Sequence, residues 1–220
     1  MSDYPVNFQI QDQLCVVVGA GPVGLRKVRG LLATGARIRL ITSASPGRDL
    51  QDVQLIQRPY RRGDLVGARL VFVATDDPVL NAAVAADARA AGIPVNRADA
   101  PERGDFTLPA VLRRGELTVA VATGGGSPAL AAAVRDNLEG FLGPEWSLVA
   151  ELAAGLRRLW LTLPTDSEYN RQVLRRLIDR GLPQRIAAGD AAGADRLLAE
   201  VVGSGVSLET LGIRLPKGEP

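Results

Sequence analysis

Residues 14–32 read LCVVVGAGPVGLRKVRGLL. The first five, Leu14–Val18, are apolar and mostly β-branched, which is typical of a parallel strand buried on both of its faces. The apolar spacing over 23–32 predicts an amphipathic helix that ends near Gly35. Three glycines with the spacing GxGxxG separate the two elements. A strand, a glycine-rich turn and a helix in this order predict the first unit of an open α/β sheet.

Each glycine of this turn has a physical role. Gly19 permits the tight turn, Gly21 lets the backbone approach a pyrophosphate, and Gly24 allows the helix to pack closely on the strand. Pro22 suits the first helical position, where its missing N–H costs nothing. Phosphates would then lie against the free N–H groups of the helix N-terminus. We therefore predict a dinucleotide site here, and favour it over a glycine-rich turn without a ligand because strand, spacing and helix agree.

Further strands and helices alternate over the first hundred residues, which predicts a Rossmann-type open parallel sheet in the α/β class. Beyond Pro101 the pattern changes to two strands, a helix and an Ala/Leu/Arg-rich helical region. We expect a sheet domain over 1–112, a strand–helix region over 113–145 and a helical domain over 146–220. The expected strands are 38–41, 54–57, 70–74, 93–95, 106–112 and 116–122; the expected helices are 78–90 and 128–141, with breaks after Trp146 at Pro164, 181–183 and 203–205.

The amino-acid composition excludes several classes of protein and of catalytic site. The 26 cationic and 24 acidic residues leave a net charge of +2, too balanced for a dedicated nucleic-acid binder. The chain has no histidine, which excludes Ser-His-Asp and Cys-His nucleophilic sites and a His-ligated metal. A single cysteine, Cys15, favours a reducing compartment. We see no signal peptide, and glycines 124–126 interrupt the longest uncharged run, so we expect a cytoplasmic protein that makes no use of a membrane.

Candidate ligand contacts follow the expected strands. The strand at 38–41 does not end in the acidic residue that usually binds the ribose 2′-hydroxyl of NAD. Ser43 and Ala44 lie at that position and could contact the ribose, whereas Arg48 would suit the 2′-phosphate of NADP. The residues alone therefore do not decide between NAD and NADP. Thr75 and Asp76 follow the strand at 70–74 and could line the cofactor site. Asp77, next to a proline, reads as a helix N-cap.

Two later motifs carry further candidates. Asp99, in Asn96–Pro101, would face the nicotinamide end of a bound cofactor, although an aspartate near a proline is also ordinary turn chemistry. A carboxylate in a partly desolvated cleft can accept a proton where no histidine is present. The turn formed by Gly124, Gly125 and Gly126 opens the next helix with Ser127, which reads either as a helix cap or as a second anion-binding turn.

The sequence resembles the precorrin-2 dehydrogenase family, which includes the N-terminal module of bifunctional siroheme synthases. The resemblance rests on four segments in the family's order and spacing: 18–27 (VGAGPVGLRK), 74–77 (ATDD), 96–101 (NRADAP) with 106–109, and 119–128 (VAVATGGGSP). It implies NAD-dependent oxidation of precorrin-2 to sirohydrochlorin by a homodimer, with the 113–142 region in the dimer interface. Asp99 matches the family's essential aspartate, and Pro22, Val23, Ser43 and Ala44 match its NAD contacts.

An acidic tetrapyrrole would suit an arginine-rich chain. Substrate contacts are expected at Arg97 and at the anion-binding turn of Gly124, Gly125 and Ser127. Arg113 and Arg114 could bind further carboxylates of the substrate. Some relatives also insert Fe²⁺ into sirohydrochlorin with the same aspartate, so a bifunctional dehydrogenase–ferrochelatase is one alternative; the lack of histidine argues against it, and no metal site is expected. A Rossmann module that senses NAD without catalysis is the second alternative, and fold alone does not exclude it.

Overall fold

The computed structural model describes residues 3–46, 50–161 and 167–215, without the side chains of 167–169. It divides into two compact units. The first comprises residues 1–108 together with 124–126, and the second comprises 109–123 and 127–220. This division places the three glycines of the later turn with the first unit. The expected three-part division of the chain stays a prediction.

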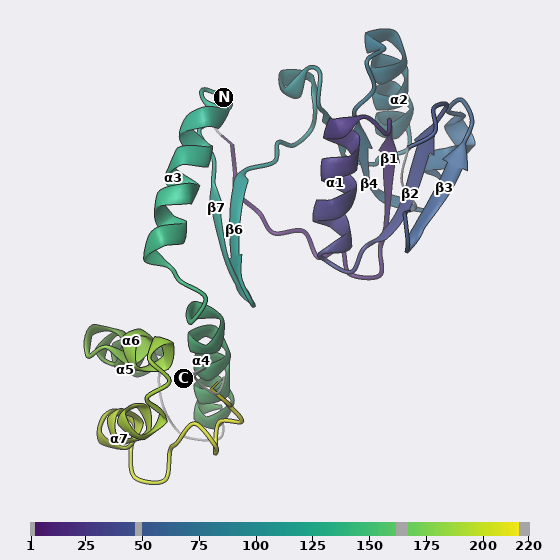
Figure 1. Ribbon diagram of the computed structural model, residues 1–220. Helices are drawn as coiled ribbons and strands as arrows, with labels where there is room; N and C mark the ends of the chain where they lie inside the picture. Colours follow the sequence, from purple (N-terminus) through teal and green to yellow (C-terminus); the bar gives the residue numbers. More distant parts are fainter. Residues whose placement is uncertain (1–2, 47–49, 162–166, 216–220) are drawn as a thin grey trace. The chain divides into compact units, whose positions relative to one another are not determined.

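The first unit is built on a five-stranded parallel sheet with the strand order β3-β2-β1-β4-β5 (Figure 1). The chain moves outward from β1 to β3, returns, and continues on the other side of β1. In such sheets ligands bind where the strand order reverses, at the carboxyl ends of the strands. The strands are β1 (Leu14–Val18), β2 (Arg37–Thr42), β3 (Val53–Gln57), β4 (Ala68–Val73) and β5 (Val95–Arg97).

Two helices cover opposite faces of this sheet. Helix α1 (Pro22–Leu32) packs with Cys15, Val17 and Phe72, whereas α2 (Pro78–Ala90) packs with the alternate strand positions Val16 and Val18. Successive side chains of a strand point to opposite faces, so β1 is buried on both sides. The buried parallel strand, the open α/β sheet and the first helix are thus confirmed. Two short 3₁₀ helices, η1 (Arg62–Leu65) and η2 (Pro101–Arg103), complete the unit.

The second unit joins a β-hairpin to helices. Strands β6 (Ala110–Arg114) and β7 (Leu117–Val121) pair antiparallel, and α3 (Pro128–Phe141) packs against both. A separate apolar core that includes Leu152, Leu177 and Leu198 holds the remaining helices together. These helices are α4 (Trp146–Trp160), α5 (Ser167–Asp179), α6 (Leu182–Ala187) and α7 (Ala191–Val201).

Several expected boundaries are wrong. The strand expected at 106–112 begins only at Ala110, so Phe106 lies outside it, and its ring packs edge-on against Phe72 of the parallel sheet with centroids 5.5 Å apart. Arg113 and Arg114 are paired within β6, so the hairpin turn falls at Gly115 and Glu116. The strand expected at 93–95 begins two residues later, and a break near Gly189, between α6 and α7, was not expected. The break at Pro164 lies outside the described residues.

Candidate functional site

The carboxyl ends of three neighbouring strands meet at one edge of the sheet. Val18 of β1 is in register with Val73 of β4, which is in register with Arg97 of β5. The next residues stay together, because the Ala74 N–H donates to the Val18 carbonyl at 2.8 Å and the Ala98 N–H donates to the Val73 carbonyl at 2.9 Å. The segments that start at residues 19, 74 and 98 therefore lie side by side.

The glycine turn after β1 has the geometry that its spacing predicts. Gly19 has a φ of +105°, and a Cβ there would lie 2.4 Å from the Ala74 carbonyl oxygen. A Cβ on Gly24 would lie 2.0 Å from the Gly19 carbonyl oxygen. By contrast, a Cβ on Gly21 would meet nothing within 4 Å. Packing thus requires the outer two glycines, whereas Gly21 leaves open space above the backbone.

That open space lies at the N-terminus of α1. Gly21 is the N-cap and offers no capping side chain, and Pro22 follows as the first helical residue. The helical ladder begins with the Leu25 N–H, which donates to the Gly21 carbonyl at 2.9 Å. The amides of Val23 and Gly24 precede it and have no acceptor within the helix. Free amides at the positive end of a helix dipole suit an anion, so these residues fit the pyrophosphate of a dinucleotide.

The neighbouring strand β2 ends in a small polar turn. The Thr42 side chain accepts a hydrogen bond from the Ala44 N–H at 3.2 Å, and Ser43 and Ala44 are exposed. Both residues lie at the carboxyl edge beside β1, where the sequence predicts a ribose contact. Arg48, the residue considered for a 2′-phosphate, lies outside the described residues.

The segment after β4 is tied to α2. Thr75 donates from its hydroxyl to Asn81 Oδ1 at 2.5 Å, and Asn81 Nδ2 donates to the Thr75 carbonyl at 3.0 Å. The Asp77 carboxylate accepts from the amides of Val79 and Leu80 at 2.8 and 3.1 Å, which confirms the expected N-cap. Asp76 is exposed beside it. No sequence signal singled out Asn81, which is fully buried on α2.

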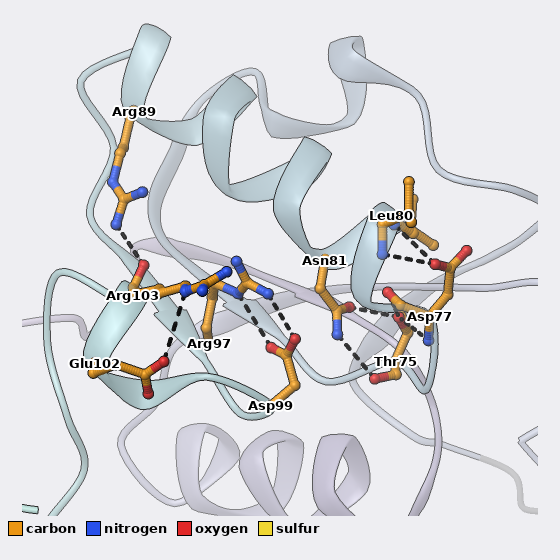
Figure 2. A network of polar contacts seen from close by, with 10 residues as sticks. Thr75, Asp77, Leu80, Asn81, Arg89, Arg97, Asp99, Glu102 and Arg103 are labelled. Atoms are coloured by element: carbon orange, nitrogen blue, oxygen red, sulfur yellow. Dashed lines mark hydrogen bonds and ion pairs between the residues drawn. The ribbon is translucent and has the colours of Figure 1, made fainter.

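The segment after β5 carries an ion pair, drawn in Figure 2. Arg97 holds the Asp99 carboxylate with Nε at 3.2 Å from Oδ1 and Nη2 at 2.6 Å from Oδ2. The Arg97 side chain is 7% exposed and that of Asp99 is 25% exposed. The hydrogen bond from Arg97 is the main cause that lowers the pKa of Asp99, while partial burial opposes it. Arg97, expected as a substrate ligand, already has a carboxylate partner within the protein.

Lys27 of α1 is a polar residue for which the sequence predicted no contact. Its Nζ donates to Asn96 Oδ1 at 2.7 Å and lies 5.7 Å from the centre of the Phe72 ring. Burial, with a smaller contribution from Arg26, lowers the pKa of Lys27 to about 8. The available signal was its rarity, since the chain has only two lysines.

The glycine-rich turn before α3 is shaped by its backbone. Gly124 and Gly125 have φ values of +58° and +81°, which favour glycine. Ser127 accepts a hydrogen bond from the Leu130 N–H at 3.1 Å, so the expected helix cap is confirmed. Gly124 and Gly125 belong to the first unit and Ser127 to the second. Anion binding by this turn stays a prediction.

The two arginines considered as further substrate contacts differ in their surroundings. Arg114 donates to the Leu142 carbonyl at 2.8 Å beyond α3, whereas Arg113 is exposed. Within residues 3–46, 50–161 and 167–215, no group of three or more potential metal ligands is found. In those same parts, no helix is both long and apolar enough to cross a lipid bilayer.

The sequence is similar to an NAD(P)-binding family model and to siroheme synthases. An NAD(P)-binding family model matches residues 6–110. The siroheme synthase of Pseudomonas paraeruginosa (strain DSM 24068 / PA7) is 37% identical over 212 residues, which are 94% of this chain and 46% of that protein. The siroheme synthase of Methylococcus capsulatus (strain ATCC 33009 / NCIMB 11132 / Bath) is 36% identical over 204 residues, 90% of this chain and 43% of that protein.

The chain thus spans about half the length of the curated relatives it matches. Among solved structures, SirC, described as a precorrin-2 dehydrogenase, has the same fold, with a TM-score of 0.68 at 21% identity. The match covers 90% of this chain and 98% of SirC. With 37% identity over 94% of its length, the chain belongs to the family that includes the siroheme synthases, while the likeness to SirC shows the shared fold.

Proposed function

We propose that the protein oxidises precorrin-2 to sirohydrochlorin with NAD, on the route to siroheme or cobalamin. The observation that carries this proposal is the position of the Asp99 carboxylate. It follows β5 at the sheet edge where the glycine turn after β1 and the Thr75 segment after β4 also lie. An anionic side chain beside a dinucleotide site suits an oxidation that makes the substrate more electron-poor.

The cofactor is proposed to bind along the carboxyl ends of β2, β1 and β4. Its pyrophosphate would take the amides at Val23 and Gly24, over the open space at Gly21. Ser43 and Ala44 would contact the ribose, and Thr75 with Asp76 would border the nicotinamide half. When bound, NAD supplies the hydride acceptor; the protein supplies position and electrostatics.

Asp99 is proposed as the catalytic residue that contacts the substrate, either to accept its proton or to orient it. Gly124, Gly125 and Ser127 remain proposed contacts for the tetrapyrrole carboxylates. A carboxylate of the substrate could reach Arg97 only by sharing it with Asp99, because the guanidinium already makes a two-point contact. The Arg97 assignment as a direct ligand is therefore the weakest of the four.

We further propose a homodimer formed through the 113–145 region. A two-stranded hairpin is marginal by itself, and α3 leaves three large apolar side chains in solvent: Leu130, Val134 and Phe141 are 55%, 39% and 76% exposed. A second copy of the hairpin and helix would cover them. The single cysteine, fully buried in β1, fits the reducing conditions of a cytoplasmic location.

The test is an anaerobic assay of the full chain with precorrin-2 and NAD, following the absorbance of reduced nicotinamide. We expect formation of sirohydrochlorin, and its loss in Asp99→Asn with NAD binding retained. Tight NAD binding without oxidation would support the sensing module instead. A parallel incubation of sirohydrochlorin with Fe²⁺ and no NAD distinguishes the bifunctional alternative, in which siroheme would form faster than without protein.

A further inference from the structure

The Asp99 carboxylate is held from within the protein. Arg97 contacts both of its oxygens, and because the Arg97 side chain is only 7% exposed, the guanidinium has little water around it. A planar guanidinium fixes a carboxylate in one orientation when it binds in this forked manner. Asp99 therefore has a defined direction before any substrate arrives.

A second group approaches Asp99 from α2. The fully buried Asn81 binds both the hydroxyl and the carbonyl of Thr75, at 2.5 and 3.0 Å. In Figure 2 the Asn81 amide, which donates to the Thr75 carbonyl, is drawn between Thr75 and Asp99, and Asn81 is among the groups that lower the pKa of Asp99. Asn81 is thus anchored to the segment after β4, on the proposed cofactor side, and favours the charged form of Asp99 in the segment after β5.

We propose, building on the function proposed above, that Arg97 and Asn81 are positioning residues that keep Asp99 a fixed carboxylate, and that Asp99 acts on the substrate through its negative charge rather than as a proton acceptor. Neither positioning residue needs to touch the tetrapyrrole. This assignment replaces the role of proton acceptor that was considered for Asp99 above.

The chemistry of the oxidation agrees with this assignment. As a hydride leaves precorrin-2, the tetrapyrrole gains positive charge, and its second hydrogen then leaves as a proton to water. A preorganised anion stabilises the charge that develops. A general base works best with a pKa near the working pH, whereas Arg97 and Asn81 both lower the pKa of Asp99.

The charged groups around Asp99 do not reverse this effect. Arg97 on β5 faces Asp99 directly, and the nearby carboxylate that acts on Arg97, Glu102 of η2, adds to its positive character. Asp77 is already engaged with the amides of its own helix. Burial of Asp99 opposes ionisation, but it ranks behind the hydrogen bond from Arg97.

The first test reads the charge of Asp99 without any assay of activity. Carboxyl-carbon NMR of the full chain labelled at aspartate gives each titration curve, and Asp99→Asn assigns the signal. We expect the pKa of Asp99 to lie below its ordinary range, to rise in Arg97→Gln, and to rise less in Asn81→Ser. The matched control Arg89→Gln breaks another arginine–aspartate pair, with Asp105 at 2.9 Å, and should leave the Asp99 curve unchanged.

The second test uses the rate. A fixed anion predicts that Arg97→Gln lowers kcat roughly 10- to 100-fold at every pH, with NAD affinity retained and partial recovery in Arg97→Lys. If Asp99 is instead a proton acceptor, kcat of Arg97→Gln should rise at high pH, because the higher pKa makes Asp99 a stronger base. A plateau of kcat in Arg97→Gln at or above that of the unmodified chain would overturn the proposal. Thermal unfolding checks that each variant is folded. If Arg97→Gln does not fold, Asn81→Ser replaces it in the rate measurements.

The two proposals fail in different ways. An unmodified chain that does not oxidise precorrin-2 would refute the proposed function and, with it, any action of Asp99 on that substrate. The NMR titration would still decide whether Arg97 and Asn81 hold the carboxylate. If Asp99 titrates at or above the ordinary value in the unmodified chain, the positioning role is wrong whatever the activity.

Discussion

The α-carbon of Gly24 faces the carbonyl oxygen of Gly19 so closely that an added methyl group would lie 2.0 Å from that oxygen. The contact joins the first turn of α1 to the end of β1. No real Cβ tolerates such a distance, so the helix could accept a side chain here only by moving away from the sheet. This closeness is what brings the helix N-terminus to the sheet edge.

Gly24→Ala and Gly21→Ala should therefore separate folding from binding. We expect Gly24→Ala to lower the free energy of unfolding by about 1–3 kcal/mol, since it overpacks the helix against the strand. Gly21→Ala meets open space, so we expect a change within about 0.5 kcal/mol but NAD binding at least about tenfold weaker. Denaturant unfolding and calorimetric titration with NAD measure the two effects. Equal stability losses in both variants would contradict this account.

The two aspartates before α2 should behave differently. Asp77 caps the helix through two amides, so Asp77→Ala should lower the free energy of unfolding by about 1 kcal/mol. Asp76 makes no such cap; Asp76→Ala should leave stability within about 0.5 kcal/mol and weaken NAD binding if it borders the cofactor. Thermal unfolding and NAD titration of both variants check this. A reversed order of stabilities would show that the cap is assigned to the wrong residue.

Lys27 should make stability depend on alkaline pH. Its pKa is lowered to about 8 in the folded chain, so above that value the folded form loses a proton that the unfolded chain still holds. Stability should therefore rise with pH from about 8 towards the ordinary lysine pKa of about 10.4. Urea unfolding at several pH values, taken as the difference between the unmodified chain and Lys27→Met, isolates this contribution. A difference that is flat or falls with pH would be inconsistent with a partly desolvated ammonium.

The buried carboxylate of Asp64 should matter at acid pH. The Asp64 side chain is 6% exposed. Its two oxygens accept hydrogen bonds from Nη2 and Nη1 of Arg58 at 2.6 and 2.8 Å, and these hydrogen bonds lower the pKa of Asp64. A lowered pKa contributes stability above the unfolded pKa of about 3.9, and that stability is lost as pH falls through the folded value.

We expect Asp64→Asn to be less stable at pH 7 by about 2 kcal/mol, with a deficit that shrinks below about pH 4. The control is Glu200→Gln, which breaks another two-point pair, with both contacts to Arg180 at 2.8 Å, on an exposed surface. Exposed pairs contribute little to stability, because water and salt screen them. Urea unfolding from pH 7 to pH 3 measures both; similar deficits would mean that burial is not the deciding factor.

The exposed apolar face of α3 should control assembly. If a second copy covers Leu130 and Phe141, the variants Leu130→Asp and Phe141→Ser should shift the chain from dimer to monomer, because a desolvated interface does not accept an unpaired charge or polar group. Sedimentation equilibrium reads the mass directly. The control is Leu161→Ser, equally exposed at 77% but located after α4. A monomeric unmodified chain would refute the proposed homodimer.

Local patterns made several elements of both units predictable. Helices α2 and α3 begin and end where the sequence placed them, at Pro78–Ala90 and Pro128–Phe141, because proline and a capping side chain define their starts. Strand β1 was equally clear, since five apolar residues run directly into a glycine. Phe106 was misplaced because its partner Phe72 is distant in sequence, and such a contact leaves no local pattern.

The sequence by itself determined that a glycine turn joins a buried strand to a helix, because that signal is contained in a few consecutive residues with fixed backbone needs. The tertiary structure alone decided which polar groups meet. Asn81 reaches Thr75 and the neighbourhood of Asp99, and Lys27 reaches Asn96 across 69 positions, because the strand order sets β1, β4 and β5 side by side. Burial and hydrogen bonding together then determine how readily Lys27 and Asp99 keep their charge, and both are properties of the assembled sheet and helices.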